Sequence, residues 1–456
     1  MHQLVDYICD YYENIDSWPA KASTEPGEYR AAFGEKAPEE PVSWEDTMDQ
    51  VNELIFKGSH HWQHPRNHGY VAVLTSFPAI MGEMISKTIN SLGFAWHSTP
   101  IVTELEVTVT DWMATAMGLP DFYKFGSGLG GGGVIHNSSS EAVVIALIGA
   151  KNYCPGPNPV QYASEMAHFS VAKAARILGV EHRTVHTVAD PKTGHYLMDI
   201  DELISMIAAD KAAGKTPVMI TAAFGATATF GLDPIEPIGR VAKQERIWFH
   251  VDAAYAGVAL ICPEYREAAT GLELSDSFNT NGHKLLLTGF NNATLYVKNL
   301  KYLAQTLKAT GSYIVPSKPN EIDLIDYMIP QGTDFPALRY WMVIQHYGLE
   351  GLRAHLRRFV QLAQTFERKI KEIEDFEVLF PSELGIVCFV VKGDDAMTRK
   401  VGDLLQERTD SIFTAAEAKH KKFLRFCICS EYTEERHIDL AIAVIQEELA
   451  AAKASA

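Results

Sequence analysis

The chain has 456 residues, of which 47% are hydrophobic and 21% are charged, and its formal net charge is −17. This composition is typical of a globular protein with at least one large domain, and the negative charge argues against nucleic acid and anionic membranes as partners. The six cysteines show neither CxxC nor metal-ligand spacing. We find no signal peptide and no apolar run near the ~20 residues of a membrane span, so we expect a cytoplasmic protein.

The first sixty residues carry apolar stripes but no core of their own. Residues 1–16 have helical periodicity, 17–42 are rich in Pro, Gly and Glu, and a capping box at 43–46 begins another helix. We expect this segment to pack as an arm on another domain or on a second subunit.

Four histidines follow within nine residues, at His60, His61, His64 and His68. Their spacing crosses a loop with Pro and Gly, whereas zinc-binding histidines of the HExxH type share one helical face. A polar loop beside a pocket is therefore favoured over a metal site, and we expect no metal.

A glycine-rich run from Gly126 to Gly133 leads to Ser138-Ser-Ser-Glu141, which has the pattern of a capping box ahead of an apolar helix. The run matches neither a dinucleotide-binding fingerprint nor a P-loop. A helix start with three hydroxyls suits a phosphate group, since backbone N–H groups and the helix dipole attract anions. Simple helix capping would explain the same residues.

Between residues 158 and 260, short apolar runs alternate with helical patterns, which predicts a mainly parallel sheet of the α/β class. Ligands of such sheets bind at the carboxyl ends of the strands. Asp252 directly follows the apolar run that ends His250-Val251, and Thr227 lies in a turn after an earlier run. We expect strands at 160–162, 183–185, 217–223 and 246–252, and helices at 168–178, 201–213 and 236–244.

Lys284 is followed at once by three leucines. A lone lysine in such a place more often extends its ammonium group to water. Here it accompanies an acid at a strand end and a helix start suited to phosphate. Pyridoxal 5′-phosphate needs all three, namely a Schiff-base lysine, a carboxylate for its pyridine nitrogen and donors for its phosphate.

The polar segment 308–324 contains one Gly and two Pro, and it could be a tether or an active-site lid. Beyond it we expect a helix from Leu338 and then an α+β domain. Its expected helices are 350–373 and 396–407, and its expected strands are 376–380, 386–391 and 423–428.

Four motifs are familiar together: His250-Val-Asp-Ala-Ala-Tyr-Ala-Gly, Asn281-Gly-His-Lys284, Gly131-Gly-Gly-Val-Ile-His-Asn-Ser-Ser-Ser-Glu-Ala and Tyr162-Ala-Ser-Glu-Met-Ala-His168. With them the chain resembles, almost end to end, the aromatic L-amino-acid decarboxylases. The resemblance implies the fold-type I pyridoxal-phosphate fold with a mainly parallel seven-stranded sheet. It also implies an arm (1–60), a large domain (61–340), a small domain (341–456), and a homodimer with the active site at the subunit interface.

The resemblance also implies roles for individual residues. Lys284 would carry the cofactor, Asp252 would pair with the pyridine nitrogen, and Tyr313 would protonate the substrate carbon after carbon dioxide leaves. The cofactor ring would lie between His168 and Ala254, near Thr227. The phosphate would lie among Ser138, Ser139, Ser140, Asn281 and His283.

The same resemblance places the substrate among Trp62, Tyr70, Val71, Val73, Leu92, Phe94 and Gly332, with Leu92 and Phe94 reaching the partner subunit's site. Tyr70-Val-Ala-Val73 departs from the usual Tyr-Phe-Pro-Thr, so Val73 replaces a polar substrate contact. Phe169 follows His168 where a small residue is common. Glycine at 332 suits bulky indole substrates, which favours tryptophan-type or broad aromatic specificity.

Three hypotheses follow for the activity. The first is an aromatic amino-acid decarboxylase that releases an arylalkylamine. The second is an aromatic aldehyde synthase, which couples decarboxylation to oxidative deamination. Such relatives typically change the loop tyrosine or the stacking histidine, and both are present here. The third is a non-catalytic binding protein of the same fold, which the presence of Lys284 and Asp252 disfavours.

Overall fold

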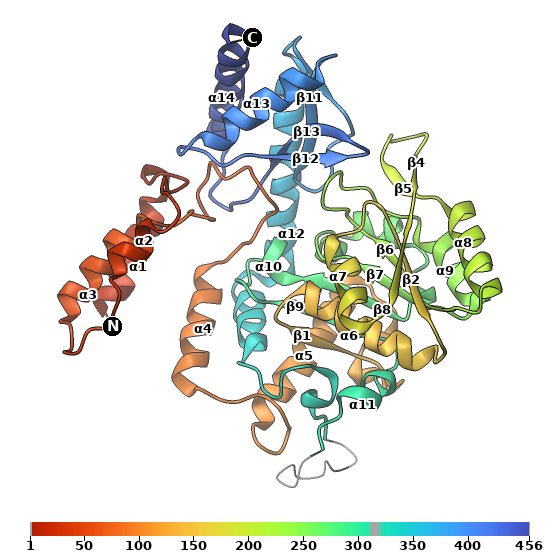
Figure 1. Ribbon diagram of the computed structural model, residues 1–456. Helices are drawn as coiled ribbons and strands as arrows, with labels where there is room; N and C mark the ends of the chain where they lie inside the picture. The colour runs from red at the N-terminus through yellow and green to blue at the C-terminus, as the bar shows by residue number, and fades with distance from the viewer. Residues whose placement is uncertain (1, 311–317, 319–320, 456) are drawn as a thin grey trace. The chain divides into compact units, whose positions relative to one another are not determined.

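The structure is a computed structural model that describes residues 2–310, 318 and 321–455 (Figure 1). Tyr313, the expected proton donor, and most of the expected lid lie outside the described residues. The chain divides into two compact units, Met1–Ala72 with Gln361–Ala456, and Val73–Val360. Each is described by itself. The three-part division expected from the sequence stays a prediction.

The helices and strands alternate along much of the chain. The helices are α1 (His2–Glu13), α2 (Glu28–Phe33), α3 (Trp44–Gln50), α4 (Phe77–Ile89), α5 (Pro100–Met117), α6 (Ser139–Tyr153), α7 (Phe169–Leu178), α8 (Ile200–Ala212), α9 (Ile235–Glu245), α10 (Gly282–Leu285), α11 (Lys301–Leu307), α12 (Pro336–Lys371), α13 (Asp395–Glu407) and α14 (Glu435–Ala454). The strands are β1 (Gly132–His136), β2 (Pro159–Ser164), β3 (Glu181–Val185), β4 (Thr187–Ala189), β5 (Tyr196–Met198), β6 (Thr216–Ala223), β7 (Trp248–Asp252), β8 (Ser277–Asn281), β9 (Ala293–Val297), β10 (Phe376–Val378), β11 (Ile386–Val391), β12 (Thr414–Ala418) and β13 (Lys421–Cys427).

The unit Val73–Val360 is built on a seven-stranded sheet with the order β1-β9-β8-β7-β6-β2-β3. The neighbours from β8 to β3 pair in parallel, while β9 runs antiparallel to both β1 and β8. Every residue of β1, β8 and β9 is buried, so both faces of this part of the sheet are covered. The mainly parallel sheet predicted from the alternation of strands and helices is confirmed.

Helix α6 packs against β6, β7, β8 and β9, and α8 and α9 pack against β6 (Figure 1). Residues 142–150 of α6 are all buried and form a core with apolar residues of β2, β6, β7, β9 and α7. A helix that is buried on all sides needs no polar face, which explains its weak amphipathic pattern. The packing directs the N-terminus of α6 to the end of β1, since only two residues separate them.

The expected elements between residues 158 and 260 are confirmed with small shifts at their ends. The strand expected from Arg246 begins at Trp248, because Arg246 caps α9 in a left-handed conformation with φ of 57°. The expected helix from Leu338 and the one over 350–373 fall in α12, which is interrupted at Gly348 with φ of 60°.

The other unit contains the antiparallel sheet β10-β11-β13-β12, with α13 packed on it and α14 packed on α13. The predicted strands 376–380, 386–391 and 423–428 correspond to three of these strands. Strand β12 escaped prediction because Thr414-Ala-Ala-Glu-Ala has little strand propensity.

The histidine-rich loop belongs to this second unit. The His61 ring contacts the Tyr11 hydroxyl at 2.8 Å, the His64 ring contacts the Trp18 carbonyl at 3.1 Å, and the His68 ring stacks on Phe426 at 4.4 Å. Burial lowers the pKa of His68 to about 3. Among the described residues there is no group of three His, Cys, Asp or Glu that could hold a metal ion. These histidines serve packing.

No helix among the described residues is long and apolar enough to cross a membrane. All six cysteines are free thiols, and four of them are buried.

Candidate active site

Lys284 lies in α10, a single helical turn that directly follows the buried strand β8. The three leucines after it are buried, each 1% exposed, whereas Lys284 itself is half-buried. The Leu74 amide donates a hydrogen bond to the His283 carbonyl at 2.6 Å. The chain just after Val73 therefore runs beside the turn that carries Lys284.

Asp252 ends β7, the strand next to β8, and it is half-buried in an otherwise buried strand. Its Oδ1 accepts hydrogen bonds from the Ala254 amide at 3.2 Å and from Nδ2 of Asn279 at 3.1 Å. The Ala254 carbonyl accepts from the Asn281 amide at 3.2 Å. These bonds tie the end of β7 to β8 and so hold the acid close to the strand that leads into Lys284.

The three serines lie at the start of α6, as predicted. Ser138 is the N-cap, and its hydroxyl accepts from the Glu141 amide at 3.2 Å. The Glu141 carboxylate accepts from the Asn137 amide rather than from Ser138, so the capping box is shifted by one residue. Ser139 donates to Oδ1 of Asn281 at 2.5 Å and accepts from Nδ2 of Asn279 at 3.1 Å. The helix start is thereby joined to β8.

His283 and Asn281 form the polar end of the same cluster, and both are 3% exposed. Their side chains meet at 3.3 Å between Nδ2 of Asn281 and Nε2 of His283. Burial, helped by the nearby Lys284 ammonium group, lowers the pKa of His283 to about 3, so the imidazole is neutral. Its Nδ1 lies 3.0 Å from both the amide and the carbonyl of Asn292, which can hold either tautomer.

His168 is the N-cap of α7, and its Nδ1 accepts from the Ser170 amide at 3.3 Å. Burial lowers the pKa of His168, the positive charge of Lys284 lowers it further, and the negative charge of Asp252 acts in the opposite direction. The imidazole therefore lies within electrostatic reach of both predicted catalytic groups. The Phe169 ring packs on it at 4.1 Å between centroids and is 69% exposed.

Thr227 lies in the turn after β6 and is half-buried. Because Ala223 at the end of β6 pairs with Asp252, this turn leaves the sheet beside Asp252. Ala254 and Ser140 are also half-buried, as are Lys284, Asp252 and Ser139, although the strands around them are buried.

The predicted substrate residues fall in two groups. In the unit Val73–Val360, Gly93 pairs with Thr333, which brings Leu92 against Gly332, and the Phe94 carbonyl accepts from the Ile325 amide at 3.0 Å. In the other unit, the Trp62 and Tyr70 rings pack at 5.3 Å, and Val71 follows them.

The site residues fit pyridoxal phosphate, because they offer hydrogen-bond donors for its phosphate, a carboxylate for its ring nitrogen and a small side chain beside its ring. Ser139, Asn281 and His283 offer hydroxyl, amide and ring N–H groups at a helix N-terminus, as a phosphate requires. Asp252 offers a carboxylate for a cationic nitrogen, and Ala254 presents only a methyl group beside it.

Sequence reasoning missed Asn279, whose side-chain amide joins Asp252 to Ser139. A signal was present, because the buried strand Ser277-Phe-Asn-Thr-Asn281 carries polar residues at every second position. Buried polar side chains need partners, so such a row marks a hydrogen-bonded network.

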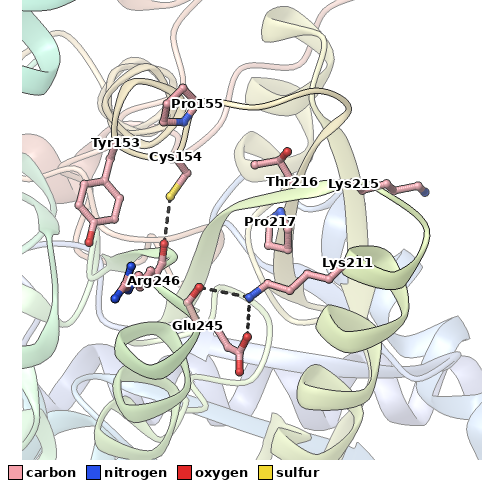
Figure 2. Close-up of a pocket in the computed structure, with 9 residues that line it drawn as sticks. All are labelled: Tyr153, Cys154, Pro155, Lys211, Lys215, Thr216, Pro217, Glu245 and Arg246. Carbon is pink, nitrogen blue, oxygen red and sulfur yellow. Dashed lines mark hydrogen bonds and ion pairs between the residues drawn. The ribbon is translucent and has the colours of Figure 1, made fainter.

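A separate surface pocket shares no residue with this site (Figure 2). Two of its cationic side chains are already paired, Lys211 with Glu245 at 2.5 Å and Lys215 with Glu181 at 2.7 Å. The Cys154 thiol contacts the Arg246 carbonyl at 3.2 Å. We therefore do not count this pocket as a catalytic site.

Comparison with known proteins shows which family the chain belongs to. The model of the pyridoxal-dependent decarboxylase conserved domain matches residues 26–392. The chain is 34% identical to tryptophan decarboxylase 2 of Oryza sativa subsp. japonica, over 98% of this chain and 93% of that protein. It is also 34% identical to the aromatic-L-amino-acid decarboxylase of Rattus norvegicus, over 96% and 94%.

A solved structure of another protein that acts in aromatic metabolism by its name shares this fold. The crystal structure of Rhodiola rosea 4-hydroxyphenylacetaldehyde synthase superposes with a TM-score of 0.92 at 31% identity, over 99% of this chain and 97% of that one. The match covers the mainly parallel sheet and the small C-terminal sheet together. The chain thus belongs to the pyridoxal-dependent decarboxylase family, among its aromatic-amino-acid members, and is a carboxy-lyase that uses pyridoxal phosphate.

Proposed function

We propose that the protein converts an aromatic L-amino acid into the corresponding arylalkylamine and carbon dioxide. The observation that carries this proposal is that Lys284 and Asp252 both lie close enough to His168 for their charges to shift its pKa. Asp252 is also hydrogen-bonded to Asn279 of β8, the strand that leads into Lys284. The helix start at Ser139 is joined to that group through Asn279.

In this proposal Lys284 carries the cofactor, Asp252 pairs with its ring nitrogen, and His168 and Ala254 lie on the two sides of its ring near Thr227. The phosphate is held by Ser138, Ser139, Ser140, Asn281 and His283. When bound, pyridoxal phosphate supplies an aldehyde for the substrate amine and an electron sink for the pair left by departing carbon dioxide.

The protein's own groups supply the surroundings of that chemistry. Lys284 is a primary amine beside three buried leucines, so it can exchange with the amine of the substrate out of bulk water. Val73, next to the turn of Lys284, offers the substrate an apolar wall. An apolar wall disfavours a charged carboxylate more than neutral carbon dioxide, which favours decarboxylation.

Tyr313 is the proposed proton donor to the substrate carbon, which makes it the residue that decides between amine and aldehyde. Its phenol would return a proton to the carbon that loses carbon dioxide. The Tyr313→Phe variant should therefore lose most amine formation and release aldehyde and hydrogen peroxide in air. The measurement is a panel of tryptophan, hydroxytryptophan, tyrosine, DOPA and phenylalanine, scored for amine, aldehyde and peroxide together.

The matched control is Lys284→Ala, which should lose the yellow chromophore, the borohydride-reducible adduct and both products. Unchanged amine output from Tyr313→Phe would remove the tyrosine from the mechanism. A reducible adduct that persists in Lys284→Ala would overturn the assignment of the lysine, and a wild-type protein without the chromophore would favour a non-catalytic role.

The second candidate function is that of an aromatic aldehyde synthase. It is favoured by the similarity to the Rhodiola rosea aldehyde synthase, which is as extensive as that to the decarboxylases. The presence of both His168 and Tyr313 argues for the amine instead. Stoichiometric peroxide from the wild-type protein would decide for the aldehyde.

We propose an indole-type or broad aromatic substrate preference. The pairing of residues 93 and 333 brings Leu92 next to Gly332. The two residues would therefore contact the same substrate ring. A methyl group built at Gly332 would lie 2.3 Å from Cδ1 of Leu92. Glycine there leaves room that a side chain would take from the substrate.

We propose further that the protein acts as a homodimer in the cytoplasm. Helix α4 exposes an apolar row spaced four residues apart, which is typical of a buried helix face. The row consists of Phe77 (41% exposed), Met81 (45%), Ile85 (42%) and Ile89 (57%). Six free cysteines suit a reducing compartment.

A further inference from the structure

Polar side chains follow two adjacent strands in the centre of the large sheet. On β7 they are His250 and Asp252, and on β8 they are Ser277 and Asn279. His250 pairs with Ser277, and Asp252 pairs with Asn279. Because strand side chains alternate between faces, all four lie on one face of the sheet. His250, Ser277 and Asn279 are 0% exposed, so their polar atoms depend on one another.

The direction of the first hydrogen bond is fixed by chemistry. The Trp248 indole N–H, which can only donate, meets the Ser277 hydroxyl oxygen at 2.7 Å. The Ser277 hydroxyl lies 2.8 Å from Nδ1 of His250, and while it accepts from Trp248 it can donate its own proton there. Nδ1 is the acceptor in that arrangement. Burial lowers the pKa of His250 to about 4, so the imidazole is neutral, and with Nδ1 as acceptor its proton lies on Nε2.

The next step runs through Asn279. Its Nδ2 donates to Oδ1 of Asp252 and to the Ser139 hydroxyl, each at 3.1 Å. Its Oδ1 is left to face His250, and a hydrogen bond with Asn279 raises the pKa of that imidazole against the effect of burial. Nε2 of His250 and Oδ1 of Asn279 are both buried, and among the described residues neither has a partner at normal hydrogen-bond geometry, so we pair these two atoms with each other.

We propose that Trp248, Ser277 and His250 form a buried relay that fixes the orientation of the Asn279 amide and, through it, Asp252 and Ser139. A reversed amide would direct its oxygen at the Asp252 carboxylate and its NH₂ group at the Nε2–H of His250. Both contacts are repulsive, so the His250 tautomer selects one orientation. The three are positioning residues, and the proposal rests on the proposed roles of Asp252 and Ser139 in holding pyridoxal phosphate.

The test compares two serines that are both 0% exposed. Ser277→Ala removes the link between Trp248 and His250. Ser275→Ala, two residues earlier, removes a buried hydroxyl that contacts Tyr123 at 2.7 Å and the Leu272 carbonyl at 2.6 Å. We expect both variants to lower the unfolding temperature of the cofactor-free protein similarly. Only Ser277→Ala should speed the loss of pyridoxal phosphate from the holoenzyme, by about tenfold.

Two further variants complete the design. His250→Phe keeps a ring in place and should resemble Ser277→Ala in cofactor loss. Nitrogen-15 NMR of labelled histidine should show the Nε2–H tautomer of His250 in the wild type and a mixture of tautomers in Ser277→Ala, a readout that packing alone would not move.

Equal cofactor loss from Ser277→Ala and Ser275→Ala, or an Nδ1–H tautomer in the wild type, would overturn the relay. Asp252→Asn separates this failure from failure of the proposed function. If Asp252→Asn loses cofactor while Ser277→Ala and His250→Phe retain it, the relay alone is wrong. If Asp252→Asn retains both cofactor and amine formation, the proposed role of Asp252 is wrong. The relay would then position a residue that the reaction does not need.

Discussion

At the scale of single residues, the chemistry of the site depends on neighbours more than on identity. Lys284 would be an ordinary lysine without the buried leucines beside it and Asp252 on the next strand. His283 is neutral because it is buried close to a cation, which lowers its pKa to about 3. The proposed specificity depends on neighbours in the same way, since the missing side chain of Gly332 would matter because Leu92 lies against it.

Gly332→Ser should shift substrate preference away from indole rings. The new Cβ would meet the end of the Leu92 side chain, which is 59% exposed and can move aside. We therefore expect the substitution to reduce the space for the substrate more than it reduces the stability of the protein. We expect the ratio of kcat/KM for tryptophan over tyrosine to fall by about tenfold, the size expected for a changed apolar pocket.

Steady-state kinetics with both substrates measure this ratio. Gly351→Ser, in α12, is the control and should leave the ratio unchanged, because a Cβ there meets only Tyr347 at 3.3 Å. An unchanged ratio in Gly332→Ser would exclude position 332 from the substrate site.

At the scale of elements, a buried glutamic acid on a neighbouring helix accepts a hydrogen bond from the edge strand of the large sheet. Strand β1 is the edge strand, and α5 packs against it. Glu106 of α5 accepts a hydrogen bond from the Ile135 amide at 2.8 Å, which satisfies a donor that no neighbouring strand reaches on that side. Burial raises the pKa of Glu106 from 4.5 to about 8, so the carboxyl group is protonated at neutral pH.

This raised pKa predicts a pH dependence of stability. Between pH 4.5 and about 8 the folded protein binds a proton at Glu106 that the unfolded chain has lost, so this contribution to the free energy of unfolding falls as pH rises. Glu106→Gln keeps the acceptor for Ile135 without the ionisation. Relative to wild type, the variant should gain stability from pH 5 to pH 8, at most about 1.4 kcal/mol per pH unit.

Urea unfolding of the cofactor-free proteins at pH 5, 6.5 and 8 measures the effect. Glu273→Gln, at an exposed position, is the control and should run parallel to the wild type. A Glu106→Gln curve that is also parallel to the wild type would show that Glu106 is ionised in the folded protein.

At the scale of the whole molecule, the exposed apolar row on α4 leads us to expect that a second subunit covers it. Met81→Glu with Ile85→Glu should separate a dimer into monomers, because two charges would be buried in an apolar interface. Light scattering measures the mass, and amine formation should fall with it if each site needs its partner.

Ile204→Glu on α8, a position that is 48% exposed, is the control and should leave mass and activity unchanged. A wild-type protein that is monomeric at full activity would contradict the homodimer.

Many of the helices, strands and site residues of this protein can be predicted from local sequence patterns. The alternation of apolar runs predicts the strands and helices between 158 and 260, since periodicity and capping act over a few residues. Lys284, Asp252 and the serine cluster are recognisable from their flanking residues and from family motifs. The antiparallel course of β9 and the strand β12 were not predicted, because pairing direction and weak strands depend on contacts far along the chain.

The sequence by itself determined the fold class, the cofactor and the residues expected to hold it. Only the tertiary structure decided how those residues are connected. Asn279 meets Ser139 across 140 positions in sequence, and Leu92 meets Gly332 through a pairing of residues 93 and 333. Such contacts depend on which strands become neighbours and in what register, a choice made by burying the whole sheet at once and therefore absent from any short stretch of sequence.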